Sequence, residues 1–157
     1  AALKSACPIV AIDCSESKKD LVFTAGASVF AAELKELGGK YDVIIDTTGI
    51  PGVISDAITH LSGKGRMILV GQPAPGRGVE VMNAVNLFSG MGQTIKATQG
   101  GKTNPTEDIP RYVRMHQEGI LDVKQFVTHR FKLDQVNDAF DLLRSGNAGR
   151  IIIEIGV

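Results

Sequence analysis

Residues 8–13 have the sequence Pro8-Ile9-Val10-Ala11-Ile12-Asp13, an apolar, largely β-branched run that ends in a carboxylate. A short run of this kind, bounded by proline and a polar side chain, is typical of a buried strand. Ser15-Glu16-Ser17-Lys18 follows, which indicates a helix start, and Gly26 is placed to end that helix. The stretch therefore predicts a strand at 9–13 followed by a helix at 15–25.

The same alternation of strand and helix continues to the end of the chain. Further strands are predicted at 28–30, 41–48, 66–70, 94–98, 126–131 and 150–155, and an edge strand at 79–81. Helices are predicted at 31–37, 84–89 and 110–119, from Pro51 to Gly63, and from Asp134 to Gly146. Apolar strands separated by helices indicate a parallel sheet covered on both faces. We therefore predict an α/β fold with a doubly wound (Rossmann) parallel sheet, in one domain over 1–157.

The composition argues against several classes of protein. Seventeen basic residues balance 17 acidic ones and no basic block occurs, so nucleic-acid binding has little support. No apolar run approaches the ~18 residues of a membrane span. Cys7, Cys14 and the three histidines show no metal-ligand spacing. We therefore predict no metal site, and a reduced, cytoplasmic protein.

Asp13 is the first indication of a ligand. In a doubly wound fold, an acid at the end of the second strand accepts hydrogen bonds from the adenosine ribose of a dinucleotide. The glycine-rich phosphate loop lies about 20 residues before that acid, which here falls upstream of Ala1. No glycines stand at positions i, i+2 and i+5. We therefore expect a partial dinucleotide-binding domain without its first strand and phosphate loop. The alternatives are that Asp13 only caps a helix, although Ser15 could also do so, and that Lys18 is an ordinary solvated lysine.

Three other strand ends are candidates for the same ligand, because open α/β sheets bind ligands outside the carboxyl ends of their strands. Each ends in small residues or glycine, which would let backbone groups approach a ligand: Thr47-Thr48-Gly49, Val70-Gly71-Gln72-Pro73 and Ala97-Thr98-Gln99-Gly100-Gly101. No nucleophile is paired with a histidine in the sequence, and the carboxylates show no paired arrangement. We therefore predict cofactor-binding residues but no catalytic residue.

Taken in order, these segments resemble the coenzyme-binding half of the medium-chain, zinc-type alcohol dehydrogenase family. The resemblance covers nearly the whole chain, and the order and spacing of its segments are more specific than any one of them. The segments are Val10-Ala11-Ile12-Asp13, Ser17-Lys18, Ala25-Gly26-Ala27, residues 41–49 and 65–73, Asp108-Ile109-Pro110, residues 126–131 and 136–143, and Gly149-Arg150-Ile151-Ile152.

The resemblance implies that Asp13 binds the adenosine ribose. It also implies a preference for NAD, since the charge of Asp13 would repel a 2′-phosphate. Lys18 would reach the same ribose, and Thr47 and Thr48 would line the adenosine side of the cleft.

The resemblance places the other end of the coenzyme at the later strands. Val70, Gln72 and Gln99 would offer backbone groups to the nicotinamide end, and Arg150 would approach the pyrophosphate. Residues 79–81 resemble the region where dimers of the family join their sheets, which predicts a homo-oligomer.

The chain departs from the family pattern in what it lacks. The N-terminal catalytic domain, which carries the Cys/His zinc ligands in the family, is missing as well as the phosphate loop, and the stretch from Gly26 to Tyr41 is short. The expected activity is therefore NAD-dependent alcohol or aldehyde oxidation in a complete enzyme, with zinc only in the absent domain and the isolated chain inactive.

Three alternatives remain open from the sequence. The first is a zinc-free quinone or enoyl reductase that uses NADPH, against which Asp13 argues. The second is a non-catalytic dimerisation domain. The third is a methyltransferase, whose sheet usually closes with an antiparallel strand pair that this sequence does not predict.

Overall fold

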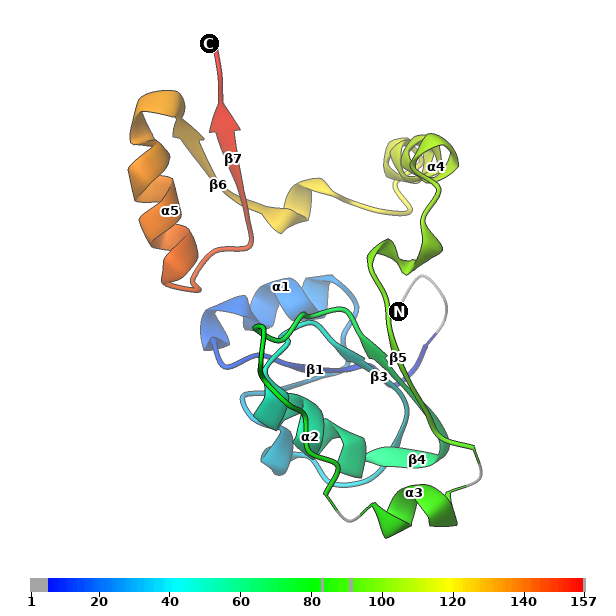
Figure 1. Ribbon diagram of the computed structural model, residues 1–157. Helices are drawn as coiled ribbons and strands as arrows, with labels where there is room; N and C mark the ends of the chain where they lie inside the picture. The colour runs from blue at the N-terminus through cyan, green and yellow to red at the C-terminus, as the bar shows by residue number, and fades with distance from the viewer. Residues whose placement is uncertain (1–5, 83, 91, 157) are drawn as a thin grey trace. The chain divides into compact units, whose positions relative to one another are not determined.

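A computed structural model describes residues 6–82, 84–90 and 92–156. The chain forms two compact units. Unit 1 combines Ala1–Glu33 with Pro105–Val157, and unit 2 is Leu34–Asn104. Figure 1 follows the chain from the first unit into the second and back. None of the helices in these described ranges is long and apolar enough to cross a membrane.

Unit 2 is built around a parallel sheet of three strands. β3 (Tyr41–Asp46), β4 (Leu61–Leu69) and β5 (Thr94–Ala97) pair in the order β3-β4-β5. α2 (Pro51–Thr59) connects β3 to β4, and α3 (Val85–Ser89) precedes β5. Short 3-10 helices lie at Leu34–Glu36 and Gly100–Lys102. Pro51 begins α2 at a position where a missing amide proton breaks no helical hydrogen bond.

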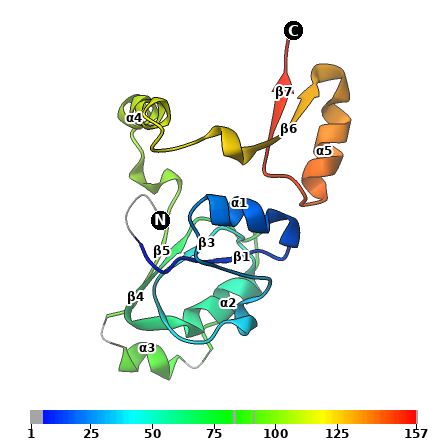
Figure 2. The same cartoon turned by 180° about the vertical axis from the view of Figure 1, so that it is seen from behind.

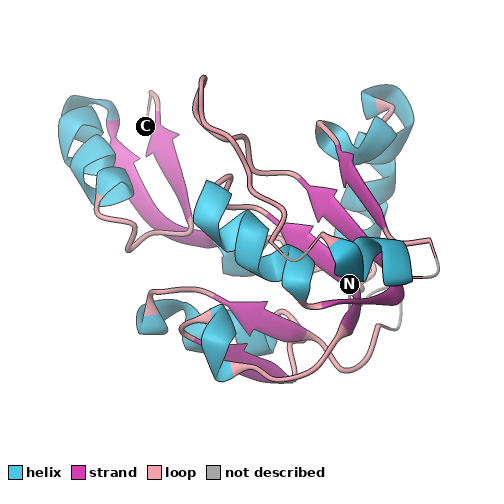
Figure 3. Ribbon diagram, turned by 60° about the horizontal axis from the view of Figure 1, so that its bottom comes forward, coloured by secondary structure: helices cyan, strands magenta, loops and turns pink. Residues whose placement is uncertain are grey.

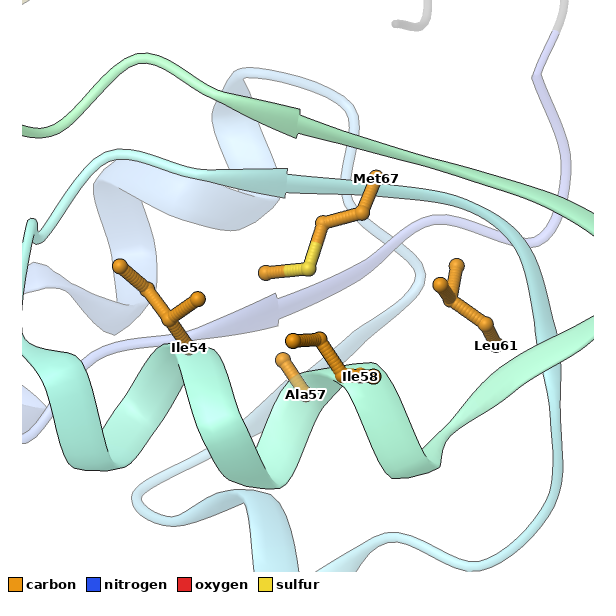
Figure 4. Packing of buried hydrophobic residues seen from close by; sticks show 5 residues of the cluster. All are labelled: Ile54, Ala57, Ile58, Leu61 and Met67. Carbon is orange, nitrogen blue, oxygen red and sulfur yellow. The ribbon is translucent and has the colours of Figure 1, made fainter. Parts of the chain in front are cut away.

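The core of unit 2 lies between α2 and β4. Ile54, Ala57 and Ile58 project from one face of α2 toward Met67, with Leu61 at the start of β4 (Figure 4). Ile54 and Met67 are completely buried. The spacing i, i+3, i+4 on the helix places the three side chains on one stripe, so the sequence pattern itself selects the buried face. This core holds α2, the helix that follows the turn 47–49, against the sheet.

Unit 1 contains two separate pairs of parallel strands. β1 (Val10–Ile12) pairs with β2 (Val29–Ala31), and α1 (Lys19–Thr24) connects them after a 3-10 turn at Glu16–Lys18. β6 (Val127–Lys132) pairs with β7 (Arg150–Glu154), and α5 (Val136–Arg144) lies alongside both strands (Figure 1; Figure 2). The remaining elements of the unit are α4 (Pro105–Gln117) and 3-10 turns at Lys124–Phe126 and Leu133–Gln135.

The predicted α/β class and parallel pairing are confirmed. Every strand pair of the described residues is parallel, and Figure 3 shows the alternation of strands and helices. The strands form three sheets rather than one continuous sheet. In the doubly wound order 3-2-1-4-5-6, strands 2 and 3 lie on one side of strand 1 and strands 4 to 6 on the other. The consecutive strands β1-β2 and β3-β4-β5 are neighbours within their own sheets, as consecutive strands are within each flank of that order.

The edge strand predicted at 79–81 is wrong. These residues form no regular element. Val79 packs against the core of unit 2, and the amide of Glu80 donates to the Ser55 hydroxyl at 3.1 Å. An amide that bonds a helix side chain is not available to a strand ladder. The homo-oligomer that this edge was expected to form stays a prediction.

Three further boundaries differ from the sequence pattern. The helix predicted at 31–37 is only the 3-10 turn at Leu34–Glu36. β4 begins at Leu61 and not at residue 66, because Leu61 already pairs with Tyr41. α4 begins at Pro105 and contains Pro110, which the sequence placed at its start. Inside a helix, Pro110 removes one hydrogen bond and its ring crowds the carbonyl of residue 106, yet the helix continues to Gln117.

Candidate functional site

Asp13 lies directly after β1 and its carboxylate is already organised. One oxygen, Oδ1, accepts a hydrogen bond from the amide of Ser15 at 2.9 Å, and Oδ2 accepts one from Lys18 Nζ at 2.9 Å. The Asp13 amide donates to the carbonyl of Ala31 at the end of β2. The side chains of Asp13 and Lys18 are 29% and 30% exposed. The pair is therefore fixed by the fold on one side and open to solvent on the other.

This geometry is compatible with both interpretations of Asp13, the turn-forming acid and the ribose-binding acid. The bond from the Ser15 amide is a local turn that a carboxylate makes after a strand, so Asp13 does organise the start of the following turn. Each carboxylate oxygen can accept a second hydrogen bond. A vicinal diol offers two hydroxyl donors, which is the chemistry that a fixed and partly exposed carboxylate accepts. The residues present fit a ribose.

The end of β3 is organised by a second carboxylate, that of Asp46. Asp46 is only 6% exposed. Its Oδ1 accepts from the amide of Thr48 at 3.1 Å and from the Thr48 hydroxyl at 2.7 Å, and its Oδ2 accepts from the amide of Gly49 at 3.0 Å. The Thr48 hydroxyl accepts in turn from the amide of Ile50, the residue before α2. The carboxylate therefore closes the turn 47–49 around itself.

The three strand ends of unit 2 meet at one edge of its sheet. Asp46 is the register partner of Leu69, and Leu69 is the partner of Ala97. The residues that follow each strand are therefore at the same level: Thr47, Thr48 and Gly49 after β3, Val70, Gly71 and Gln72 after β4, and Thr98 and Gln99 after β5. The amides of Val70 and Gly71 donate to the Asp46 carbonyl at 2.8 and 3.1 Å. The amide of Thr98 donates to the Leu69 carbonyl at 2.9 Å.

Gly49 and Gly71 are explained by contact between the turns themselves. A Cβ on Gly71 would lie 2.2 Å from the Gly49 nitrogen, and one on Gly49 would lie 2.5 Å from the Gln72 carbonyl oxygen. Gly49 also has a φ of +66°, in the left-handed region that favours glycine. The sequence predicted that these glycines let backbone approach a ligand. The structure shows that they let two backbone turns approach each other.

The predicted cofactor residues are distributed over the two units. Thr47, Thr48, Gly49, Val70, Gly71, Gln72, Ala97 and Gln99 are together at the carboxyl edge of unit 2. Asp13 and Lys18 are joined to each other in unit 1. Arg150 also belongs to unit 1, where it is exposed at the first residue of β7 opposite Val127. The roles of all these residues stay predictions.

Sequence reasoning assigned no role to Asp46. The residue was visible as the acid that ends the apolar run 41–46, much as Asp13 ends the run 9–13. That parallel was the available signal. Its burial, and the fact that it accepts bonds from both neighbouring turns, are visible only in the structure.

The described residues do not form a zinc site. In those ranges, no three His, Cys, Asp or Glu side chains are grouped so that they could hold a metal ion. Cys7 and Cys14 are both exposed free thiols. A hollow of about 610 Å³ lies at Lys132, Leu133, Asp134, Glu154 and Gly156, and it contains none of the predicted site residues. The strand ends, and not this hollow, carry the predicted site residues.

Parallel strands that are connected by helices and whose carboxyl ends meet at one edge define an α/β protein of the Rossmann-like class. Residues 19–153 match the zinc-binding dehydrogenase family, and the chain belongs to that family. The chain is 30% identical over 156 residues to an L-threonine 3-dehydrogenase from Vibrio cholerae, which covers 93% of this chain and 43% of the relative.

Solved structures agree with this assignment. The benzyl alcohol dehydrogenase of Acinetobacter calcoaceticus superposes with a TM-score of 0.86 at 26% identity, over 96% of this chain and 43% of that one. Two structures below 20% identity share the fold: an alcohol dehydrogenase from Escherichia coli complexed with NADH (TM-score 0.74) and a protein from Sinorhizobium meliloti bound to NADP (TM-score 0.70). The chain spans less than half the length of the relatives it matches.

Proposed function

We propose that this chain is the coenzyme-binding part of an NAD-dependent, zinc-type alcohol or aldehyde oxidoreductase, and that residues 1–157 form a partial dinucleotide-binding domain. The family supports the class of reaction, since the relatives include alcohol dehydrogenases. The single observation that carries the coenzyme assignment is the fixed, partly exposed carboxylate of Asp13 at the end of β1, with Lys18 bound to it at 2.9 Å.

The charge at Asp13 supports NAD rather than NADP. A 2′-phosphate would bring up to two negative charges against the carboxylate, and two like charges about 4 Å apart repel by roughly 1 kcal/mol in water and more in a partly buried site. Lys18 offsets part of this repulsion, but its ammonium is held against Asp13 Oδ2 at 2.9 Å, so a 2′-phosphate would meet the carboxylate as well as the ammonium. A free ribose diol instead donates to the carboxylate, and the ammonium is placed to donate to the same hydroxyls.

The residues at the carboxyl edge of unit 2 are further proposed coenzyme contacts. In this proposal Thr47 and Thr48 line the adenosine side, and Val70, Gln72 and Gln99 offer backbone groups to the nicotinamide end. Gly49, Gly71 and Ala97 complete the cofactor-binding edge. Arg150 supplies the positive charge for the pyrophosphate. The bound coenzyme would accept or give up a hydride. We propose that the zinc ligands and the alcohol site lie in residues other than those described. We also propose that the protein is located in the cytoplasm.

Coenzyme preference tests the proposal. NADH and NADPH are titrated against the intact protein and its Asp13→Asn variant, with binding followed by coenzyme fluorescence. Glu16→Gln is the matched control, because it removes one exposed acid three residues away. We expect the unsubstituted protein and the control to bind NADH at least tenfold more tightly than NADPH. Asp13→Asn should lose most of that preference, a change of about 1.4 kcal/mol in the difference between the two binding free energies.

The same titration separates the alternatives. A preference for NADPH in the unsubstituted protein would contradict the assignment of Asp13 and favour the zinc-free quinone or enoyl reductase branch. Binding of neither coenzyme would favour a non-catalytic role. An Asp13→Asn variant with unchanged preference would place the selectivity in other residues.

A further inference from the structure

We propose that Asp46 is a positioning residue that sets the turns after β3 and β4 as one unit, and thereby holds the coenzyme-binding edge of unit 2 in its binding conformation. The inference rests on the proposed function for its consequence, but the positioning itself stands on contacts within unit 2. Asp46 is 6% exposed, and the coenzyme assignment gives it no contact of its own.

A buried carboxylate persists only when hydrogen bonds replace the water it has lost. Asp46 receives three such bonds, all from the turn that follows it: two from Thr48 and one from the amide of Gly49. Bonds to an ionised acceptor are about twice as strong as neutral ones. The negative charge of Asp46 therefore selects one conformation of the turn 47–49.

The same residue also holds the neighbouring turn. The backbone carbonyl of Asp46 accepts from the amides of Val70 and Gly71. Gly71 in turn lies so close to Gly49 that an added Cβ would stand 2.2 Å from the Gly49 nitrogen. With no room between the two backbones, a change in the turn 47–49 must displace the turn 70–72. The Asp46 side chain thus fixes the turn 47–49 directly, and the close contact between Gly49 and Gly71 carries that constraint to the turn 70–72.

The test compares Asp46→Asn with Asp42→Asn. Both variants remove one negative charge from β3, but Asp42 is exposed and bonds only the Ser62 hydroxyl among the hydrogen bonds described for it. In Asp46→Asn a donor replaces one acceptor oxygen, so one of the amides of Thr48 and Gly49 loses its partner. Amide hydrogen exchange is measured by NMR on the intact protein, and NADH binding is measured by fluorescence at a temperature where both variants are folded.

We expect Asp46→Asn to raise amide exchange at Thr48 and Gly49, and also at Val70 and Gly71, by at least about tenfold, the size of one lost charge-assisted bond. NADH binding should weaken by about the same factor. Asp42→Asn should change neither. A purely structural role would instead raise exchange across the whole sheet, including β5, and that result would overturn the proposal.

The two hypotheses fail separately. If the unsubstituted protein does not bind NADH, the proposed function is wrong, and the exchange at Val70 and Gly71 still decides the positioning role. If NADH binds and those two amides exchange alike in both variants, the positioning role is wrong. If Asp46→Asn does not fold, the variant Thr48→Val is used in its place. Thr48→Ser is then the matched control, because it keeps the hydroxyl. Faster exchange at Gly71 in the valine variant alone supports the role, and equal exchange in the two contradicts it.

Discussion

Replacing Gly71 by alanine tests the interlocked turns most directly. The added Cβ would lie 2.2 Å from the Gly49 nitrogen, 2.6 Å from the Thr47 carbonyl carbon and 2.7 Å from that of Thr48. Ordinary contact begins at 3.4 Å, so the nearest atom is 1.2 Å too close. All three neighbours are backbone atoms. No side chain can rotate away, and the two turns must separate.

The expected cost follows from what separation breaks. Forced overpacking costs about 1–3 kcal/mol. Moving the turns apart also weakens the bond from the Gly71 amide to the Asp46 carbonyl, which contributes about 1 kcal/mol. We therefore expect Gly71→Ala to lower the free energy of unfolding by roughly 2–4 kcal/mol, measured by urea denaturation with circular dichroism.

Gly52→Ala is the matched control for this measurement. Gly52 lies in the first turn of α2, and an added Cβ there would have no atom within 4 Å. Alanine in a helix is more stable than glycine by up to about 1 kcal/mol, so this variant should be neutral or slightly stabilised. If Gly71→Ala were as stable as the control to within about 0.5 kcal/mol, the turns would not be interlocked and the coupling proposed for Asp46 would lose its basis.

Three further substitutions probe the core and the site. Ile54→Ala removes a completely buried side chain and should lower the free energy of unfolding by about 2–5 kcal/mol, where a loss below 1 kcal/mol in urea would contradict the core described here. Lys18→Met breaks a partly exposed ion pair, so the free energy of unfolding should fall by no more than about 1 kcal/mol. NADH affinity, followed by fluorescence, should fall severalfold, and unchanged affinity would remove Lys18 from the site. Ser55→Ala deprives the Glu80 amide of its acceptor and should lower the free energy of unfolding by about 1 kcal/mol. Hydrogen exchange at that amide should become faster, and unchanged exchange would show that another group holds it.

The strands were predictable because their signal is local. Runs such as Tyr41–Asp46 and Arg150–Glu154 are apolar and β-branched, and they are bounded by glycine or polar residues. Runs of this kind separated by helices favour parallel pairing, and every described strand pair is parallel. The amphipathic stripe of Ile54, Ala57 and Ile58 is likewise written in the sequence and became the core of unit 2.

The errors arose where a local pattern was overridden by a distant contact. Val79 and Glu80 alternate as an edge strand would, but the Ser55 hydroxyl on α2 captures the amide that a ladder would use. Leu61 extends β4 because Tyr41, 20 positions away, is its partner. Sequence spacing carries no information on either contact, since both depend on which residue the folded chain brings opposite.

The site divides in the same way. The acid after β1 and the lysine five residues later were identified from the chain, and the structure joins Asp13 to Lys18 at 2.9 Å. The sequence also shows that residue 46 is an aspartate, but nothing nearby in the sequence distinguishes its buried carboxylate from an exposed one such as that of Asp42. Burial depends on packing against β4, which lies at the far end of α2.

The sequence by itself determined the fold class, the family resemblance and the acid proposed to select the coenzyme, because each depends on residue type and spacing along the chain. Only the tertiary structure decided that Asp46, Leu69 and Ala97 lie in register and that Gly49 and Gly71 touch. These are long-range backbone relations. Hydrogen bonds between strands set them to within an ångström, and no pattern of side chains along the chain specifies that register.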